Sequence, residues 1–402
     1  MTVPENTRPQ RVGWSRSESP TTFSSLSYDD SIYIKRIEGQ LPQVCAVYVD
    51  DVWIFTQQQS FHDAFLRTLR EHFRTTEPVH LHDGETAVFL AHEVSIKDDI
   101  LCFSQTGYIE QCKQKSVPKY LSQREMNIPV HSLNPQHFDP TWLASPDDAV
   151  ETDFLTTADM TTLRGIVNTI SYCSGSTHPE LAAPLSVLAR SQGGGRVHKR
   201  VLASAKNLLR YMFHNVNFET RIPISNFRVV PGSVKHYCLH ADFDASFGQE
   251  RSREGVILFL NNSYCQHKSS LQTTVSLSTT EAELGAASSA ARLIMGSFNF
   301  LNELLKGVDF ANVTAPVIWG DNSAANQIGN CTASVRRVRH LTLSQLYIRS
   351  LTEDGTLSIR EKRTQNMTAD LLTKILNEAK IYFFRECLLV VFFMSLVGIF
   401  RR

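Results

Sequence analysis

The sequence predicts an α/β protein in which an α+β segment comes first, a helical connection follows, and a mixed five-stranded sheet with flanking helices comes last. Two observations predict this order. Residues 31–125 and 233–376 alternate short apolar, β-rich runs with helical spacing, whereas residues 151–215 show helical spacing alone. The composition is that of a globular protein, with 42% hydrophobic and 20% charged residues in a chain of 402, which can bury several cores.

Charge and cysteine usage narrow the class of protein. The formal charge is zero, with 40 basic and 40 acidic residues, so net charge alone does not indicate a nucleic-acid-binding protein. The eight cysteines form no CxxC pair and no zinc-ligand spacing, which predicts reduced, mostly buried thiols in an intracellular protein. The apolar run from Cys387 to Phe400 is short for a bilayer span, so we do not expect membrane association; a tail anchor is the alternative.

Five segments follow one another where composition and periodicity change. They are a polar lead-in (1–30), a partial α+β domain (31–125), a linker and helical connection (126–232), a second α/β domain (233–376) and an apolar tail (377–402). Four prolines and little periodicity over 126–150 indicate the linker.

Apolar spacing predicts the individual elements. In the first domain, Asp50 and Asp51 separate two β-rich runs, which predicts a hairpin with two acids at its tip. Ser278 and Glu281 fit a capping box and predict the start of a long helix. The other expected elements are helices at 61–73, 161–174, 181–191 and 198–213, a hairpin from 87–96 and 100–103, and strands at 237–242, 256–260, 263–268, 316–320 and 356–361.

Acidic residues of the second domain lie at strand ends and helix starts, where distant parts of a chain can converge. Asp242 and Asp244 share one face of the first strand, so either can be the first acid. Glu283 lies beside the apolar stripe of the long helix, Asp321 follows a buried strand, and Asp370 opens the last helix. Carboxylates are the ligands that hard cations prefer, and two divalent cations can activate water and stabilise the leaving oxyanion in phosphodiester cleavage.

Five stretches surround these acids: Asp244-Ala-Ser-Phe-Gly248, Ser278-Thr-Thr-Glu-Ala-Glu283, Asp321-Asn-Ser-Ala324, Arg339-His340 and Thr368-Ala-Asp-Leu-Leu-Thr-Lys374. Together they resemble the ribonuclease H domain of copia-type LTR retrotransposon polyproteins. The resemblance implies a ribonuclease H-like sheet, and two Mg²⁺ ions (Mn²⁺ being the alternative) held by Asp244, Glu283, Asp321 and Asp370. It also implies His340 as an auxiliary residue near the scissile phosphate, and it favours Asp244 over Asp242.

The chain departs from that family at two places. Leu341-Thr342 replaces the Ile-Asp pair that usually follows the family's histidine, and the loop between Asp244 and Gly255 is shorter than usual. These departures support a second hypothesis, a catalytically inactive transposon relic that at most binds nucleic acid. A tail-anchored membrane protein with a co-opted nuclease domain is the third hypothesis.

The upstream stretch Tyr48-Val-Asp-Asp51 resembles the palm hairpin of reverse transcriptases, which implies Asp50 and Asp51 as an acidic pair of the polymerase site. Residues 89–94, 104–110 and 163–191 resemble later segments of the same polyproteins. The palm is therefore partial, because the third carboxylate and the nucleotide-binding fingers come earlier in the family and nothing before Tyr48 resembles them. We do not expect RNA-directed DNA polymerase activity from this chain alone.

The resemblance implies an endonuclease that hydrolyses RNA in RNA–DNA hybrids, which it would recognise by duplex shape and 2′-OH groups. The expected partners are the hybrid, the missing polymerase portion and other retrotransposon proteins. The expected location is the cytoplasm, with a retrotransposon particle or the nucleus as alternatives. The candidate phosphate contacts are Lys268, Arg336, Arg337, Arg339 and Lys374.

Overall fold

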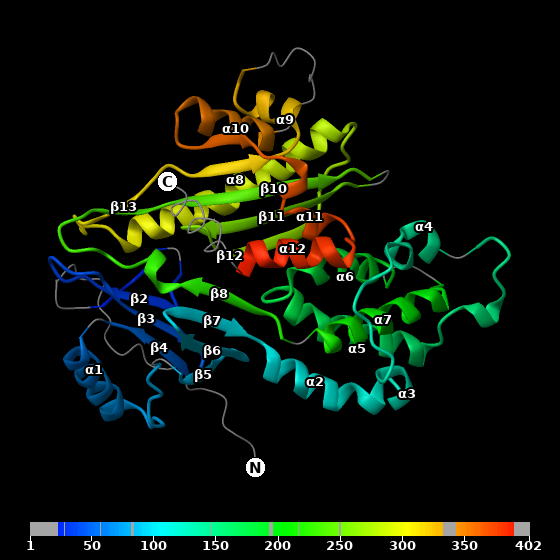
Figure 1. Ribbon diagram of the computed structural model, residues 1–402, viewed down its shortest axis with the longest axis horizontal. Helices are drawn as coiled ribbons and strands as arrows, with labels where there is room; N and C mark the ends of the chain where they lie inside the picture. Colours follow the sequence, from blue (N-terminus) through cyan, green and yellow to red (C-terminus); the bar gives the residue numbers. More distant parts are fainter. Residues whose placement is uncertain are drawn as a thin grey trace, which may run out of the picture. The chain divides into compact units, whose positions relative to one another are not determined.

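The computed structural model describes residues 23–389 with gaps at 28, 57, 82–83, 145, 193–195, 216, 249–250 and 333–342 (Figure 1). Contacts divide the chain into two compact units. The first holds the described residues of 1–79 with 229–237 and 296–313, and the second holds those of 80–228, 238–295 and 314–402.

The first unit contains an antiparallel sheet in the order β1-β2-β3-β4. Its elements are β1 (Ser24–Ser25), β2 (Ile32–Lys35), β3 (Gln43–Tyr48), β4 (Asp51–Phe55) and α1 (Gln59–His72), with β9 (Lys235–Tyr237) and β13 (Ala311–Val313) forming a separate parallel pair. The hairpin expected around Asp50 and Asp51 is confirmed, since Tyr48 pairs with Asp51 across a two-residue turn. The helix expected over 61–73 is confirmed as α1.

A four-stranded antiparallel sheet opens the second unit, in the order β5 (Thr86–Phe89), β6 (His92–Lys97), β7 (Ile100–Ser104) and β8 (Glu219–Pro223). The hairpin expected around residues 97–99 is confirmed by the antiparallel pairing of β6 with β7. The single strand expected over 87–96 is wrong, because the chain turns at Leu90 and Ala91. Both residues have positive φ angles, 48° and 54°, which a two-residue hairpin turn requires. Leucine and alanine are not typical of such a turn, so the apolar run from 87 to 96 gave no indication that the chain turns there.

A helical core occupies the middle of the second unit. Its elements are α2 (Thr106–Lys119), α3 (Gln123–Met126), η1 (Pro135–Phe138), α4 (Pro140–Leu143), η2 (Glu151–Asp153), α5 (Thr157–Ser174), η3 (Pro179–Leu181), α6 (Ala182–Arg190), α7 (Lys199–His214) and η4 (Ile224–Asn226). The three helices expected here are confirmed as α5, α6 and α7. Residues 126–150, where we expected a linker, bury Met126, Val130, Leu133, Phe138 and Leu143 in this core.

The expected mixed five-stranded sheet is confirmed, in the order β12-β11-β10-β14-β15. Strands β10 (Leu239–Ser246), β11 (Arg253–Leu260) and β12 (Ser263–Leu271) are antiparallel, whereas β14 (Val317–Gly320) and β15 (Ser358–Glu361) run parallel to β10. The associated helices are α8 (Thr279–Leu304), α9 (Ser323–Gly329), α10 (Leu343–Glu353), η6 (Thr364–Asn366), α11 (Asp370–Thr373) and α12 (Glu378–Leu389).

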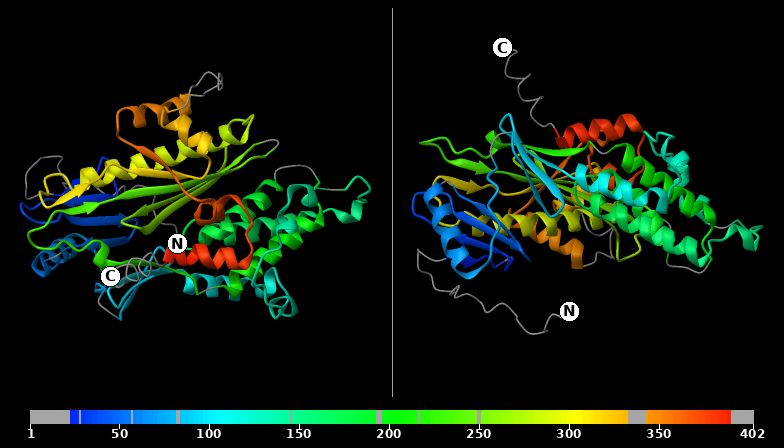
Figure 2. Two further views of the ribbon diagram at one scale, coloured as in Figure 1. Left: turned by 45° about the horizontal axis from the view of Figure 1, so that its top comes forward. Right: turned by 90° about the horizontal axis from the view of Figure 1, so that it is seen from below.

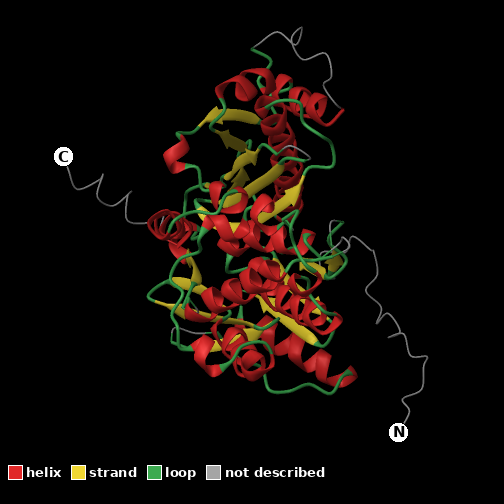
Figure 3. Cartoon of the chain, turned by 90° about the vertical axis from the view of Figure 1, so that its right-hand side faces the viewer, coloured by secondary structure: helices red, strands yellow, loops and turns green. Residues whose placement is uncertain are grey.

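Helices cover both faces of this sheet (Figure 2; Figure 3). On one face, the Glu254 carboxylate of β11 accepts a 2.7 Å hydrogen bond from the Ser289 hydroxyl of α8. On the other face, Gly255 of the same strand lies against α11, which leaves no room there for a larger residue. Successive residues of β11 therefore contact opposite layers, as strand geometry requires.

The beginning of the apolar tail is part of the fold. Ile381, Phe384 and Leu388 of α12 are buried in one cluster with residues of the sheet and α11. No helix among the described residues is both long enough and apolar enough to cross a membrane. Residues 390–402, which contain most of the apolar run, lie outside the described part of the chain.

Candidate metal centre

Parallel pairing brings the candidate acids together. Because β10 and β14 run in the same direction, their carboxyl ends meet at one edge of the sheet. Asp244 lies near the end of β10, and Asp321 immediately follows β14. Helix α8 begins at Thr279, so Glu283 projects from its first turns. Three sequence-distant acids thus share one edge.

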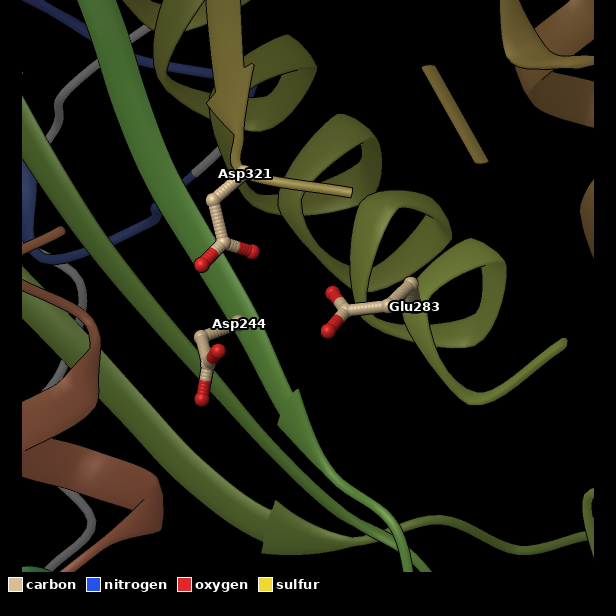
Figure 4. A group of neighbouring side chains, drawn as sticks. All are labelled: Asp244, Glu283 and Asp321. Atoms are coloured by element: carbon tan, nitrogen blue, oxygen red, sulfur yellow. The ribbon is translucent and has the colours of Figure 1, made fainter. Parts of the chain in front are cut away.

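The three carboxylates point into a common space (Figure 4). One oxygen from each of Asp244, Glu283 and Asp321 can be chosen so that all three lie within 4.8 Å of one another. The Asp244 and Glu283 side chains are buried, and Glu283 Oε2 has no hydrogen-bond partner. A buried carboxylate oxygen without a donor, in an all-oxygen set, is the arrangement that a divalent cation such as Mg²⁺ or Mn²⁺ fits.

Burial and the neighbouring acids raise the pKa of Glu283 to about 8. Burial is the main cause, and the charges of Asp244 and Asp321 add to it, whereas Lys374 opposes it. Three carboxylates so close together repel one another, and a bound cation would relieve that repulsion. Without a cation, the three acids cannot all be charged without a cost in free energy.

The start of α8 is held in place by its cap and by one buried amide. The Ser278 hydroxyl accepts from the Glu281 backbone N–H at 3.2 Å, and the Glu281 carboxylate accepts from the Leu277 N–H at 2.7 Å. The Gln272 amide donates to the Ala282 carbonyl at 2.6 Å, immediately before Glu283. The sequence predicted the cap but not the role of Gln272, because a single glutamine belongs to no recognisable motif.

Asp242 and Asp370 stand apart from the three clustered acids. Asp242 is fully buried, and its carboxylate accepts from the Lys362 ammonium and, at 2.5 Å, from the Thr368 hydroxyl. Asp370 is also buried, and its carboxylate contacts the Lys374 ammonium at 2.5 Å. Each of these two acids therefore already has a lysine partner.

Lys374 connects Asp370 to the cluster. Its ammonium lies 3.2 Å from Asp244 Oδ1 and 2.5 Å from Asp370 Oδ1. The neighbouring Thr373 hydroxyl donates to the other oxygen of Asp244. The two carboxylates raise the pKa of Lys374 in spite of its partial burial, so this side chain carries a firm positive charge. Sequence reasoning named Lys374 only as a phosphate contact.

The remaining candidate residues are not brought to this edge by the described structure. His340 and Arg336, Arg337 and Arg339 lie outside the described residues. Lys268 forms a 2.9 Å ion pair with Glu254. Asp50 and Asp51 are exposed in the first unit, and no metal-binding group among the described residues includes them.

Comparisons with known proteins identify relatives among transposon proteins. No protein-family model matches the chain. It is 22% identical over 371 residues to the retrovirus-related Pol polyprotein from transposon TNT 1-94 of Nicotiana tabacum, covering 91% of this chain and 26% of that protein. It is also 24% identical over 359 residues to the retrovirus-related Pol polyprotein from transposon RE1 of Arabidopsis thaliana. That match covers 88% of this chain and 22% of that protein. The chain thus spans about a quarter of the length of these curated relatives.

Solved structures give weaker likenesses. Ribonuclease H1 from Halobacterium salinarum NRC-1 is 12% identical with a TM-score of 0.25, over 36% of this chain and 98% of that one. The foamy viral protease-reverse transcriptase in complex with RNA/DNA hybrid is 13% identical with a TM-score of 0.37. That match covers 80% of this chain and 36% of that one. The sequence relatives, which cover nearly all of this chain, are the comparison that bears on function.

Proposed function

Starting from the chain's homology to retrovirus-related Pol polyproteins of plant copia-type transposons, we propose that it is a reverse transcriptase/ribonuclease H fragment of such a polyprotein. Its second domain, residues 233–376, hydrolyses the RNA strand of RNA–DNA hybrids. The observation that carries the proposal is the convergence of Asp244, Glu283 and Asp321 within 4.8 Å at one sheet edge.

The residues divide the work of holding two cations. Asp244, Glu283 and Asp321 would hold one divalent cation, and Asp244 with Asp370 would hold a second. When bound, such a pair supplies an activated water and stabilises the leaving oxyanion. Glu283 must give up its proton to become a ligand, because burial and its neighbours favour the protonated form. Asp244 converges with Glu283 and Asp321, whereas Asp242 does not belong to that group, which supports Asp244 as the first ligand.

The polymerase reaction is not part of this proposal. Asp50 and Asp51 lie at an exposed hairpin tip, and no third acid joins them in a metal-binding group within the described residues. Nucleotidyl transfer by two metals needs such a convergent set. The pair is therefore a trace of polymerase ancestry in this chain, and a separate polymerase portion remains a proposed partner.

Cleavage of a labelled RNA–DNA hybrid by the purified chain tests the proposal. With Mg²⁺ or Mn²⁺ we expect cutting of the RNA strand only, and we expect Asp321→Asn to abolish it. Asp147→Asn is the matched control, because Asp147 is an exposed acid of the same unit outside the site. A folded wild-type protein that binds the hybrid without cutting it would instead support the inactive relic.

A further inference from the structure

The Lys374 ammonium lies between two of the carboxylates proposed to share a cation. It is 3.2 Å from Asp244 Oδ1 and 2.5 Å from Asp370 Oδ1. Lys374 follows Asp370 by four residues, just beyond the single turn of α11, so the helix fixes this approach. The contact with Asp370 is thus local, whereas the contact with Asp244 depends on how α11 packs against β10.

Positive charge is distributed unevenly over the acids of this edge. Asp370 has Lys374 and, at 3.8 Å, Lys380, and Asp242 has Lys362. Within the described part of the chain, by contrast, no lysine or arginine forms an ion pair with Glu283 or Asp321. Lysine side chains therefore neutralise Asp242 and Asp370, whereas Glu283 and Asp321 have no such partner among the described residues.

We propose that Lys374 occupies the second cation position, between Asp244 and Asp370, and acts as a displaceable internal cation. The chain then binds one divalent ion readily at Asp244, Glu283 and Asp321. A second ion enters only when the Lys374 side chain leaves, because both would compete for the same carboxylate oxygens and repel each other. This inference rests on the proposed function, since it concerns the same carboxylates.

The side chain has the properties that displacement requires. Lys374 exposes 39% of its side chain, so solvent lies beside it. A lysine side chain has four methylene carbons joined by rotatable bonds, so the ammonium can move away while the backbone of α11 stays in place. We therefore expect the first ion to bind at low metal concentration and the second ion to bind only at a higher concentration.

Metal titration by calorimetry, followed in parallel by tryptophan fluorescence, tests the inference without measuring activity. Trp319, one of four tryptophans in the chain, lies two residues before Asp321, so we expect its fluorescence to change when the first ion binds. For wild-type protein titrated with Mn²⁺, we expect one tight site and a second site at least about tenfold weaker. Lys374→Met should strengthen the second site by about tenfold or more and leave the first within about twofold.

Two further variants sharpen the test. Lys374→Arg keeps the charge and should keep the second site weak. Lys206→Met is the matched control, because Lys206 pairs with Glu125 at 3.3 Å and touches none of the candidate ligands. Two sites of equal affinity in the wild-type protein would overturn the inference whether or not Lys374→Met folds. A folded wild-type protein that binds no Mn²⁺ at all would instead overturn the proposed function.

Discussion

The Arg385 guanidinium lies 3.4 Å from the Glu180 carboxylate, with side-chain exposures of only 4% and 1%. Arg385 belongs to α12 and Glu180 to η3, and the guanidinium also lies over the Phe218 ring. No hydrogen bond satisfies the oxygens of Glu180 or the terminal nitrogens of Arg385, so charge is what joins the two residues. The pair ties the C-terminal helix to the helical core of the second unit.

Loss of one member of this pair should destabilise the protein strongly. Arg385→Met leaves the Glu180 carboxylate buried and uncompensated, and we expect a loss of about 3–5 kcal/mol in the free energy of unfolding. The double variant Glu180→Met/Arg385→Met should recover most of that loss. Urea unfolding of the three proteins measures both effects; additive losses in the double variant would contradict this account.

Glu283 should make stability depend on pH in the absence of metal. Its pKa rises from an ordinary 4.5 to about 8 on folding, so the folded state holds a proton that the unfolded state releases. Stability from this group is complete below pH 4.5 and is lost as the pH rises to about 8. Glu283→Gln imitates the protonated form and should unfold about 3 °C or more above wild type at high pH.

Thermal unfolding in EDTA across this pH range checks that expectation. The advantage of Glu283→Gln should shrink toward acidic pH, where the wild-type carboxyl is also protonated. Parallel profiles for the two proteins would show that the pKa of Glu283 is not raised by its surroundings.

Gly255→Ala should disturb α11 and, through it, the site. A β-carbon at this position would lie 2.7 Å from Leu372 Cβ and 3.0 Å from the Ala369 carbonyl oxygen, and the backbone oxygen cannot easily yield. We expect a loss of about 1–3 kcal/mol in stability and reduced hybrid cleavage, because α11 carries Asp370.

Gly175→Ala is the matched control for that change. Its added carbon would meet the Ser171 and Tyr172 carbonyl oxygens at ordinary distances of 3.5 and 3.9 Å, and its φ of −78° suits any residue. Urea midpoints of the two variants give the comparison. Equal midpoints would mean that the sheet accommodates a larger residue under α11.

Primer extension should be absent from this chain. Asp50 and Asp51 are exposed, and no described acid completes a metal-binding group with them. A primed RNA template incubated with the protein, Mg²⁺ and deoxynucleotides should therefore yield no extended product. Asp50→Asn should also leave hybrid cleavage unchanged; extension that this variant abolishes would reveal a working polymerase site.

The sequence predicted the strands and helices that have strong periodicity. The long helix was found from Ser278 and Glu281, and the five strands of the mixed sheet from apolar runs bounded by polar residues. The convergence of Asp244 and Asp321 followed from their places at the ends of buried strands. These features depend on local pattern, which a single sequence contains.

Features that depend on tertiary contact were beyond the sequence. The turn at Leu90 and Ala91 uses positive φ angles without glycine or asparagine, so no residue type marked it. Proline-rich residues 126–150 appeared loose, yet the helical core buries their few apolar side chains, such as Phe138. The bridge made by Lys374 could not be foreseen, because it depends on where Asp244 lies relative to α11.

The parallel pairing of β10 with β14 and β15 also has a consequence for biosynthesis. Asp244 is made early, whereas Asp321 and Asp370 come from much later parts of the chain, and these strands can pair only after the later parts have left the ribosome. A nascent chain stopped before β14 thus has β10 with an unpaired edge and no assembled carboxylate cluster. During translation, the carboxylate cluster is therefore assembled only after β14 and Asp321 have left the ribosome.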